Sequence, residues 1–389
     1  MPSISLTSIN SALEKKMDGT DSSSNLTDVL RLANAADDFT STVSYDSSGL
    51  MPTDSAFIGT LARDNDGTVY AYDGSTWSRP NKDGSITLPR SFGGTSTAYA
   101  MGGLNFPGTQ FDTIQSWPFA ADVDATDIAN LTSGTYGSTS TQSATHGYNS
   151  GGYRNPWSNI IEKFSFADNT DATDVGDLTV AQTAYQSGSS SPTHGYTAGG
   201  LNPSTRRSIE KYSHSSDGNA TSVGNLATYD TGSHRGAAGA TDFGVKGYSS
   251  GGHSANNQIQ HYPFASDADA TDAADLTVQR EYATGSSSST HGYSSGGEIN
   301  PGGTDANNIE KFPFATDTNS TDVGDLTAAK DHLNQTGACS TTHGYVHGGY
   351  PYPTASNVIE KFSFTTDGNS SDVGDLIGTQ YRYTPGTHV

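Results

Sequence analysis

The sequence predicts an all-β protein whose main part is a β-propeller of six four-stranded sheets. Three markers recur about every 50 residues: a Gly-Gly pair, an Ile-led aromatic segment such as IEKF, and an Asp-rich loop that ends in Leu. Periods of about 40 to 50 residues without a helical pattern are typical of radially repeated sheets. The six pairs are Gly102-Gly103, Gly151-Gly152, Gly199-Gly200, Gly251-Gly252, Gly296-Gly297 and Gly348-Gly349.

Each repeat contains four segments with the composition of strands. In one repeat, a first strand over Tyr282–Ser287 turns at the THG triplet into a second strand, GYSSGG. The IEKF segment gives the third strand and the DVGDLT segment the fourth. Because stacked sheets are covered on both faces, their strands need no strict alternation of apolar and polar residues. Small residues suit the crowded inner strands, which accounts for 32% hydrophobic residues and 45 Gly.

The last segment, Thr379–Val389, resembles the first strand of a repeat that does not continue. Its sequence TQYRYTPGTHV parallels the stretch Val278–Tyr293. We expect it to complete the sheet that begins at Tyr99–Gly103, which gives six blades. Residues 86–93 could also supply a first strand there, so a ring of seven blades is the alternative.

The composition divides the chain into three parts. Residues 1–36 predict two short helices that form an attachment segment, with apolar stripes at Ile9 and Leu13 and at Leu26, Val29 and Leu30. Helices of this length are marginal in water, so these stripes must dock on something. Residues 37–83 predict a small β-meander, because Asp-Gly turns separate alternating aromatic segments. Residues 84–389 form the predicted propeller.

The motifs resemble known families. The order of Gly-Gly strand, aromatic strand and closing strand over residues 84–389 is similar to the kelch family of propellers, although Val175, Val323 and Val373 stand where that family has Trp. The stretches GTLARDNDGTVYAYDGSTW, SINSALEKK and NLTDVLRLANAA resemble segments of tailed-phage appendage proteins. The IEKFSF, DVGDLT and THGY blocks resemble kelch-like virion proteins of phages that infect marine bacteria.

This resemblance implies a virion structural protein, a tail or neck appendage present in multiple copies. The N-terminal region would attach to neck, tail or capsid proteins, and the propeller would serve host attachment, through a surface glycan or protein, or particle decoration. The protein would be assembled into virions in the host cytoplasm. Two alternatives remain: a cellular kelch-type scaffold for protein complexes, and a glycan-active enzyme.

Charge restricts the partners. The formal net charge is −22 with only 19 Lys and Arg, whereas nucleic-acid binding needs a basic face. Anionic membranes are disfavoured for the same reason. We expect no membrane insertion, because the sequence has neither a long apolar stretch nor a signal peptide at its start. Cys339, the only cysteine, is expected to be a small filler near an inner strand.

The sequence shows no catalytic motif, so we expect no enzyme and no cofactor. The histidines of the THGY blocks recur once per repeat, which favours a scaffold role over catalysis. The Asp-rich loops place oxygen ligands at alternate positions, as a weak Ca²⁺ site would need. Turn formation is the favoured role for these residues, and calcium is the alternative. The candidate calcium ligands are Asp267, Asp269, Asp272, Asp317, Asn319 and Asp322.

Recognition is expected in the loops between the second and third strands, which vary most between repeats. Variable loops on a rigid framework commonly carry binding residues. Tyr153, Trp157, Tyr350 and Tyr352 are the candidate binding residues, since exposed aromatics stack on sugars or anchor proteins. The alternative is that they only pack locally.

Overall fold

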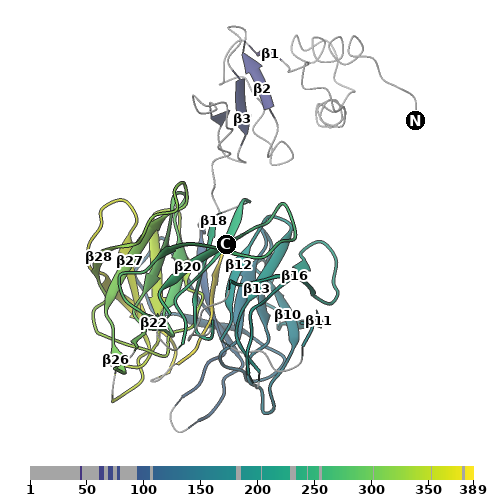
Figure 1. Ribbon diagram of the computed structural model, residues 1–389. Coiled ribbons are helices and arrows are strands. Elements are labelled where there is room, and N and C mark those ends of the chain that lie inside the picture. Colours follow the sequence, from purple (N-terminus) through teal and green to yellow (C-terminus); the bar gives the residue numbers. More distant parts are fainter. Residues whose placement is uncertain are drawn as a thin grey trace. The chain divides into compact units, whose positions relative to one another are not determined.

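The computed structural model describes residues 94–105, 108–180, 185–202, 204–227, 234–242, 244–253, 256–300, 302–351, 353–378 and 382–389, preceded by four short strands. The chain divides into two compact units, Met1–Ser91 and Phe92–Val389 (Figure 1). All regular secondary structure in the described residues is β-strand, so the predicted all-β class is confirmed. The boundary expected at residue 83 stays a prediction.

The first unit contains one four-stranded sheet in the order β1-β2-β3-β4. Its strands are β1 (Ser44–Tyr45), β2 (Leu61–Asp64), β3 (Val69–Tyr72) and β4 (Trp77–Ser78). β2, β3 and β4 pair antiparallel in sequence order, which is the predicted meander, and β1 pairs parallel to β2. The expected helices of residues 1–36, with the anchoring residues Ile9, Leu13, Leu26, Val29 and Leu30, lie outside the described residues.

The second unit repeats one antiparallel four-stranded sheet six times among its described residues. In sheet order the strands are β8 (Thr139–Gln142), β9 (His146–Ser150), β10 (Ile160–Ser165) and β11 (Thr173–Asp177); β12 (Ser187–Ser190), β13 (His194–Ala198), β16 (Ser208–Ser213) and β17 (Thr221–Asn225); β18 (Ala238–Asp242), β19 (Lys246–Ser250), β20 (Gln258–Pro263) and β21 (Thr271–Asp275); β23 (Thr284–Ser287), β24 (His291–Ser295), β27 (Asn308–Pro313) and β28 (Thr321–Asp325); β29 (Ala338–Cys339), β30 (His343–His347), β31 (Val358–Ser363) and β32 (Ser371–Asp375); and β33 (Gly386–His388), β5 (Thr97–Met101), β6 (Thr113–Pro118) and β7 (Thr126–Asn130). Two additions lie in the loops: the pair β14 (Leu201–Asn202) and β15 (Ser204–Thr205), and the small sheet of β22 (Arg280–Glu281), β25 (Glu298–Ile299) and β26 (Thr304–Asp305).

The sixth sheet joins distant parts of the chain. β33 pairs antiparallel with β5, and Thr387 lies opposite Tyr99. The expectation that the last segment completes the sheet begun near Tyr99 is therefore confirmed. The first strands of the six sheets lie beside one another in the order β8, β12, β18, β23, β29 and β33, and β33 lies beside β8 again.

Glycines fix both ends of this arrangement. The Gly-Gly pair that ends each second strand has a positive φ at both residues, for example 65° and 94° at Gly296 and Gly297. Side chains rarely adopt that conformation, which is why the pair recurs. Between neighbouring first strands the backbones approach so closely that a Cβ added at Gly285 would overlap the carbonyl oxygen of Gly239.

The apolar core lies between neighbouring sheets rather than within one layer. Each of six clusters combines a second-strand Tyr, a third-strand Ile and the Leu after the fourth strand with an aromatic residue of the next sheet. In one cluster Tyr148, Ile161 and Leu178 pack against Tyr212 of the following sheet. The cluster of the β29–β32 sheet packs against Trp117 of β6. Each sheet thus packs against the next, and the last against the first.

A buried acid or amide also joins each pair of sheets. The second residue of the IEKF segment accepts a hydrogen bond from the backbone N–H that follows the buried Leu of the preceding sheet, as Glu310 does from Thr277 at 2.7 Å. The same contact occurs at Gln115, Glu162, Glu210, Gln260 and Glu360. Three of these buried carboxylates form ion pairs, Glu162 with Arg154, Glu310 with Arg280 and Glu360 with Lys330. Buried charge is tolerated because it is paired and hydrogen-bonded.

Candidate binding site

The second unit has two ends, defined by its connections. The turn face carries the THG turns between first and second strands, and the loop face carries the longer connections between second and third strands. On the turn face the four histidines of the THGY blocks serve their own turns. Nδ1 of His146, for example, lies 2.8 Å from Oγ1 of Thr145, and the same contact recurs at His194, His291 and His343. A recurring turn contact of this kind is what a scaffold role predicts.

The Asp-rich loops hold neighbouring sheets together at the outer edge. Asp267 pairs with Nζ of Lys211 at 2.6 Å, and Asp317 lies 3.3 Å from Nε2 of His261. Asp267 and Asp317 are both candidate calcium ligands. The spacing that would let such residues reach an ion also lets them reach the adjacent strand.

The other four calcium candidates have similar protein partners. Asp269 accepts from the backbone N–H of Asn225, Asn319 from that of Asp275, Asp322 from that of Gly324, and Asp272 from the side-chain amide of Gln258. Burial raises the pKa of Asp272 against the effect of that amide. Within the described residues, no group of three or more His, Cys, Asp or Glu side chains is arranged to hold a metal ion. These contacts favour two roles for the loops, turn formation and attachment of one sheet to the next.

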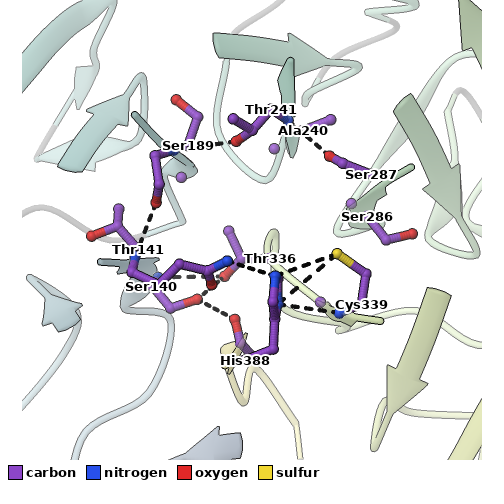
Figure 2. Close-up of a pocket in the computed structure, with 17 residues that line it drawn as sticks. Ser140, Thr141, Ser189, Ala240, Thr241, Ser286, Ser287, Thr336, Cys339 and His388 are labelled. Carbon is purple, nitrogen blue, oxygen red and sulfur yellow. Dashed lines mark hydrogen bonds between the residues drawn. The ribbon is translucent and has the colours of Figure 1, made fainter. Parts of the chain in front are cut away.

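The six first strands neighbour one another in a closed order, and the line they surround is here called the axis. At its turn-face end, polar side chains surround a cavity of about 40 Å³ (Figure 2). A belt of hydrogen bonds passes from strand to strand around it. The backbone N–H groups of Gln142, Ser190 and Thr241 donate to the hydroxyls of Ser190, Thr241 and Ser287 at 2.9, 3.2 and 2.8 Å. Each donor lies on one first strand and each acceptor on the next.

Cys339 and His388 complete the belt. The Cys339 backbone N–H donates to Nδ1 of His388 at 3.2 Å, and Nε2 of His388 lies 2.5 Å from the amide nitrogen of Gln142. The Cys339 sulfur lies 3.6 Å from the imidazole Nε2, a pairing that resembles a nucleophile and its base. Burial nevertheless raises the pKa of the Cys339 thiol to about 12, so the thiolate needed for attack is scarce at neutral pH. A buried Cys339 within the belt agrees with the small filler that the sequence predicts at this position.

The loop face gathers three of the four expected binding aromatics. Tyr153 and Trp157, from the β9–β10 loop, contact each other edge to face with ring centroids 4.9 Å apart. Tyr350, after β30, lies 5.6 Å from the ring of His332. All three are partly exposed. Tyr352 lies outside the described residues.

A buried plug of tyrosines connects these aromatics at the centre of the loop face. The rings of Tyr185, Tyr282 and Tyr383 form a triangle with centroid distances of 5.1 to 5.5 Å. Trp157 contacts the plug through Tyr185, and His332 contacts it through Tyr282 and Tyr383. The exposed aromatics are therefore supported by a packed base, which limits their movement.

The plug residues adopt strained backbone conformations. The φ angles of Tyr185, Tyr282, His332 and Tyr383 are 61°, 55°, 52° and 56°. Left-handed conformations at residues other than Gly cost about 1 to 3 kcal/mol each and occur most often at functional sites. The sequence predicts a first strand that begins at Tyr282, whereas β23 begins at Thr284. The positive φ of Tyr282 explains this difference.

An acidic groove of about 540 Å³ opens beside this plug. Glu298 and Asp305 from the β25–β26 hairpin, Asp331 and the Tyr350 ring line it. Burial, and then the carboxylates of Glu281 and Asp331, raise the pKa of Glu298. The groove therefore has a negative potential. Its neighbour Glu281 is paired with Arg235 and lies 2.7 Å from Nδ1 of His253.

Sequence reasoning missed the plug and the groove. The plug had a signal, since Tyr185, Tyr282 and Tyr383 share a Tyr-x-x-Gly spacing before the inner-strand glycine. The groove had none, because its residues come from three separate segments.

Comparison with known proteins leaves the family open. Neither a protein-family model nor a curated protein matches the sequence. Within the described residues no helix is long and apolar enough to cross a membrane. The case for a function therefore depends on the geometry of the loop face.

Proposed function

We propose that the second unit is a six-bladed, kelch-like β-propeller that works as a binding module through its loop face. The circular order of the first strands, the packing of the last sheet on the first and the β33–β5 pairing support the propeller. Six repeated four-stranded sheets favour six blades over seven. Such a ring presents its loops from a rigid support, as recognition requires.

The observation that carries the binding function is the convergence of aromatics from separate loops. Tyr153, Trp157 and Tyr350 are far apart in sequence, yet all three contact residues of one buried plug or its immediate neighbours. Partly exposed aromatic rings on a packed base are the usual anchors of protein and carbohydrate binding. The raised pKa of the Cys339 thiol argues against nucleophilic catalysis at the axis, which also favours a binding function.

Together with the resemblance of the sequence to phage virion proteins, the loop face supports a more specific role. The chain is a structural protein of a tailed-phage virion, attached to neck, tail or capsid proteins by its N-terminal region and present in multiple copies. Its propeller recognises a glycan or protein on the host surface. The strongly negative charge of the chain fits a role without nucleic acid.

The test is adsorption by particles that carry loop-face variants. In the phage that encodes this chain, Tyr153→Ala combined with Trp157→Ala should leave the amount of protein per particle unchanged and slow adsorption at least tenfold. Val245→Ala, which truncates an exposed apolar side chain on the turn face, is the matched control and should adsorb normally. Mass spectrometry of purified particles measures incorporation. Normal adsorption by the double variant, or absence of the protein from particles, would contradict the proposal.

A further inference from the structure

The acidic groove has the size and rigidity of a ligand site. Its volume of about 540 Å³ lies within the range of about 300 to 1,000 Å³ that is usual for small-molecule pockets. The small sheet β22-β25-β26 holds Glu298 and Asp305, and the backbones of Asp331 and Tyr350 bridge each other. The lining residues are thus held by paired backbone and not by an isolated loop.

One lining carboxylate has unused hydrogen-bonding capacity. Asp331 is 5% exposed, and its Oδ2 atom is paired with Nδ1 of His332. Its Oδ1 atom is buried and has no hydrogen-bond partner among the described residues. A buried charged acceptor without a donor destabilises the protein, and a bound ligand that donates a hydrogen bond to it removes that cost. The groove is therefore built for a donor that the protein does not itself supply.

The chemistry of the lining selects the ligand class. Ionised carboxylates only accept hydrogen bonds, so Glu298, Asp305 and Asp331 suit a ligand rich in O–H or N–H groups. Tyr350 lines the same groove, with the Arg382 guanidinium 5.2 Å from its ring centroid, and aromatic rings are suited to the C–H face of a sugar ring. Three carboxylates together repel anions. Saccharides that carry carboxylates or phosphates are therefore excluded, and an amine substituent is favoured.

We propose that this acidic groove binds a saccharide unit that is uncharged or carries an amine, and that it discriminates against acidic saccharides. The proposal rests on the proposed function, because it names the ligand class of the same loop face. The hydroxyl or ammonium groups of the sugar donate to Glu298 and Asp331 while its ring packs on Tyr350. Discrimination comes from charge and aromatic stacking together.

The experiment is a binding panel with the purified full chain. Trisaccharides of glucose, galactose and mannose are compared with the matching amino sugars and uronic acids by calorimetry at low and at physiological salt. We expect at least one neutral or amine-bearing probe to bind, with at least tenfold weaker binding of its acidic counterpart. Asp331→Asn and Glu298→Gln should each weaken binding of the amine-bearing probe at least tenfold. Tyr350→Ala should weaken binding of both the neutral and the amine-bearing probes.

Controls keep the result interpretable. Asp168→Asn removes an exposed carboxylate that accepts a hydrogen bond from Ser165 in its own turn and does not line the groove, so it should bind like the parent chain. If Asp331→Asn unfolds, the partly exposed Glu298→Gln carries the test. Failure of every probe, equal binding of acidic probes, or retention of binding in the groove variants overturns the proposal. Tighter binding of a lysine-rich peptide than of any saccharide would also overturn it in favour of a protein ligand.

The two proposals can fail separately. If adsorption depends on Tyr153 and Trp157 but no saccharide binds the groove, the loop-face function stands and the ligand class is wrong. If a saccharide binds the groove but particles with the Tyr153→Ala and Trp157→Ala changes adsorb normally, the ligand class stands and host attachment through the loop face fails.

Discussion

The two ends of the central axis are built from the same repeat but have opposite chemistry. At the turn face, three first strands donate a backbone hydrogen bond to a hydroxyl of the next strand, and Cys339, His388 and Gln142 make the other contacts around a cavity of about 40 Å³. At the loop face, three tyrosines fill the axis and an acidic groove lies beside them. At the turn end one type of contact, a backbone N–H to a hydroxyl of the next strand, recurs between several sheets, whereas the aromatic and acidic residues of the loop end come from individual loops.

This difference separates assembly from recognition. The recurring contacts of the turn face are ones that any sheet can make with its neighbour. They therefore help to determine how the sheets associate. At the irregular end, Gly137 and Gly236 occupy the positions that Tyr185 and Tyr282 hold in other sheets, and an added Cβ at either glycine would press on a tyrosine ring. Alternating small and large residues let three rings fill one axis, which six identical residues could not do.

The largest effect is expected where first strands touch. Gly285→Val should prevent stable folding, because its side chain would overlap the Gly239 carbonyl and the neighbouring backbone has no room to move. The expected loss exceeds about 4 kcal/mol, since overpacking of this severity is beyond ordinary core strain. Gly218→Val is the matched control: no atom lies within 4 Å of its added Cβ, so only backbone strain opposes it. Thermal unfolding followed by circular dichroism measures both, and similar melting temperatures would refute the tight axis.

The next effect compares the two ends directly. Tyr282→Ala should lower the free energy of unfolding by about 3 to 5 kcal/mol, as loss of a buried aromatic ring does. Ser190→Ala, which removes one hydroxyl from the belt, should lower it by about 1 kcal/mol. Because φ at residue 282 is 55°, Tyr282→Gly should be less destabilising than Tyr282→Ala by about 1 kcal/mol despite losing one more carbon. Urea titration gives all three values, and equal losses at the two ends would remove the distinction between plug and belt.

The last effect is a dependence on pH that both ends share and that is absent at neutral pH. Burial, with His194 nearby, lowers the pKa of His214 to about 4 beside the turn face, and burial lowers that of His347 to about 4 near the closing strand. An unfolded chain would bind protons at about pH 6.5. Each neutral histidine therefore stabilises the fold above pH 6.5, and this stabilisation is lost between pH 6.5 and 4 at about 1.4 kcal/mol per pH unit.

His214→Gln and His347→Gln should each reduce that slope by nearly one proton. Urea unfolding at pH 7, 6, 5 and 4.5 measures the slopes, with Val245→Ala as the control that keeps both imidazoles. An unchanged slope in both variants would show that folding does not lower the pKa of these histidines.

Much of the fold could be predicted because its signals repeat. The Gly-Gly pairs, the IEKF segments and the buried leucines each mark the same place in every sheet, and the similarity of TQYRYTPGTHV to an internal repeat identified the closing strand. The Asp-rich loops show the limit of spacing arguments. Asp267 and Asp269 have the spacing of metal ligands, yet they contact Lys211 and Asn225 of the preceding sheet.

The candidate site was predictable only in part. Tyr153, Trp157 and Tyr350 were recognisable as aromatics in variable loops, but sequence gives no reason for them to meet around a plug. His332 packs on the plug from a position two residues before the one that the plug tyrosines hold in their repeats, so it does not share their spacing to the inner-strand glycine. The groove depends on the β25–β26 hairpin, which pairs with β22 in the only three-stranded sheet among the described residues.

The pairing of β33 with β5 has a consequence for biosynthesis. β5 leaves the ribosome long before its partner at Gly386–His388, and at about 5 to 20 residues per second the delay is on the order of tens of seconds. Throughout that interval the strand Thr97–Met101 has one unpaired edge, and exposed edges of this kind recruit other chains. Nascent copies on neighbouring ribosomes of one messenger are the nearest such chains, so slow translation of the last repeats should favour exchange of this strand between copies.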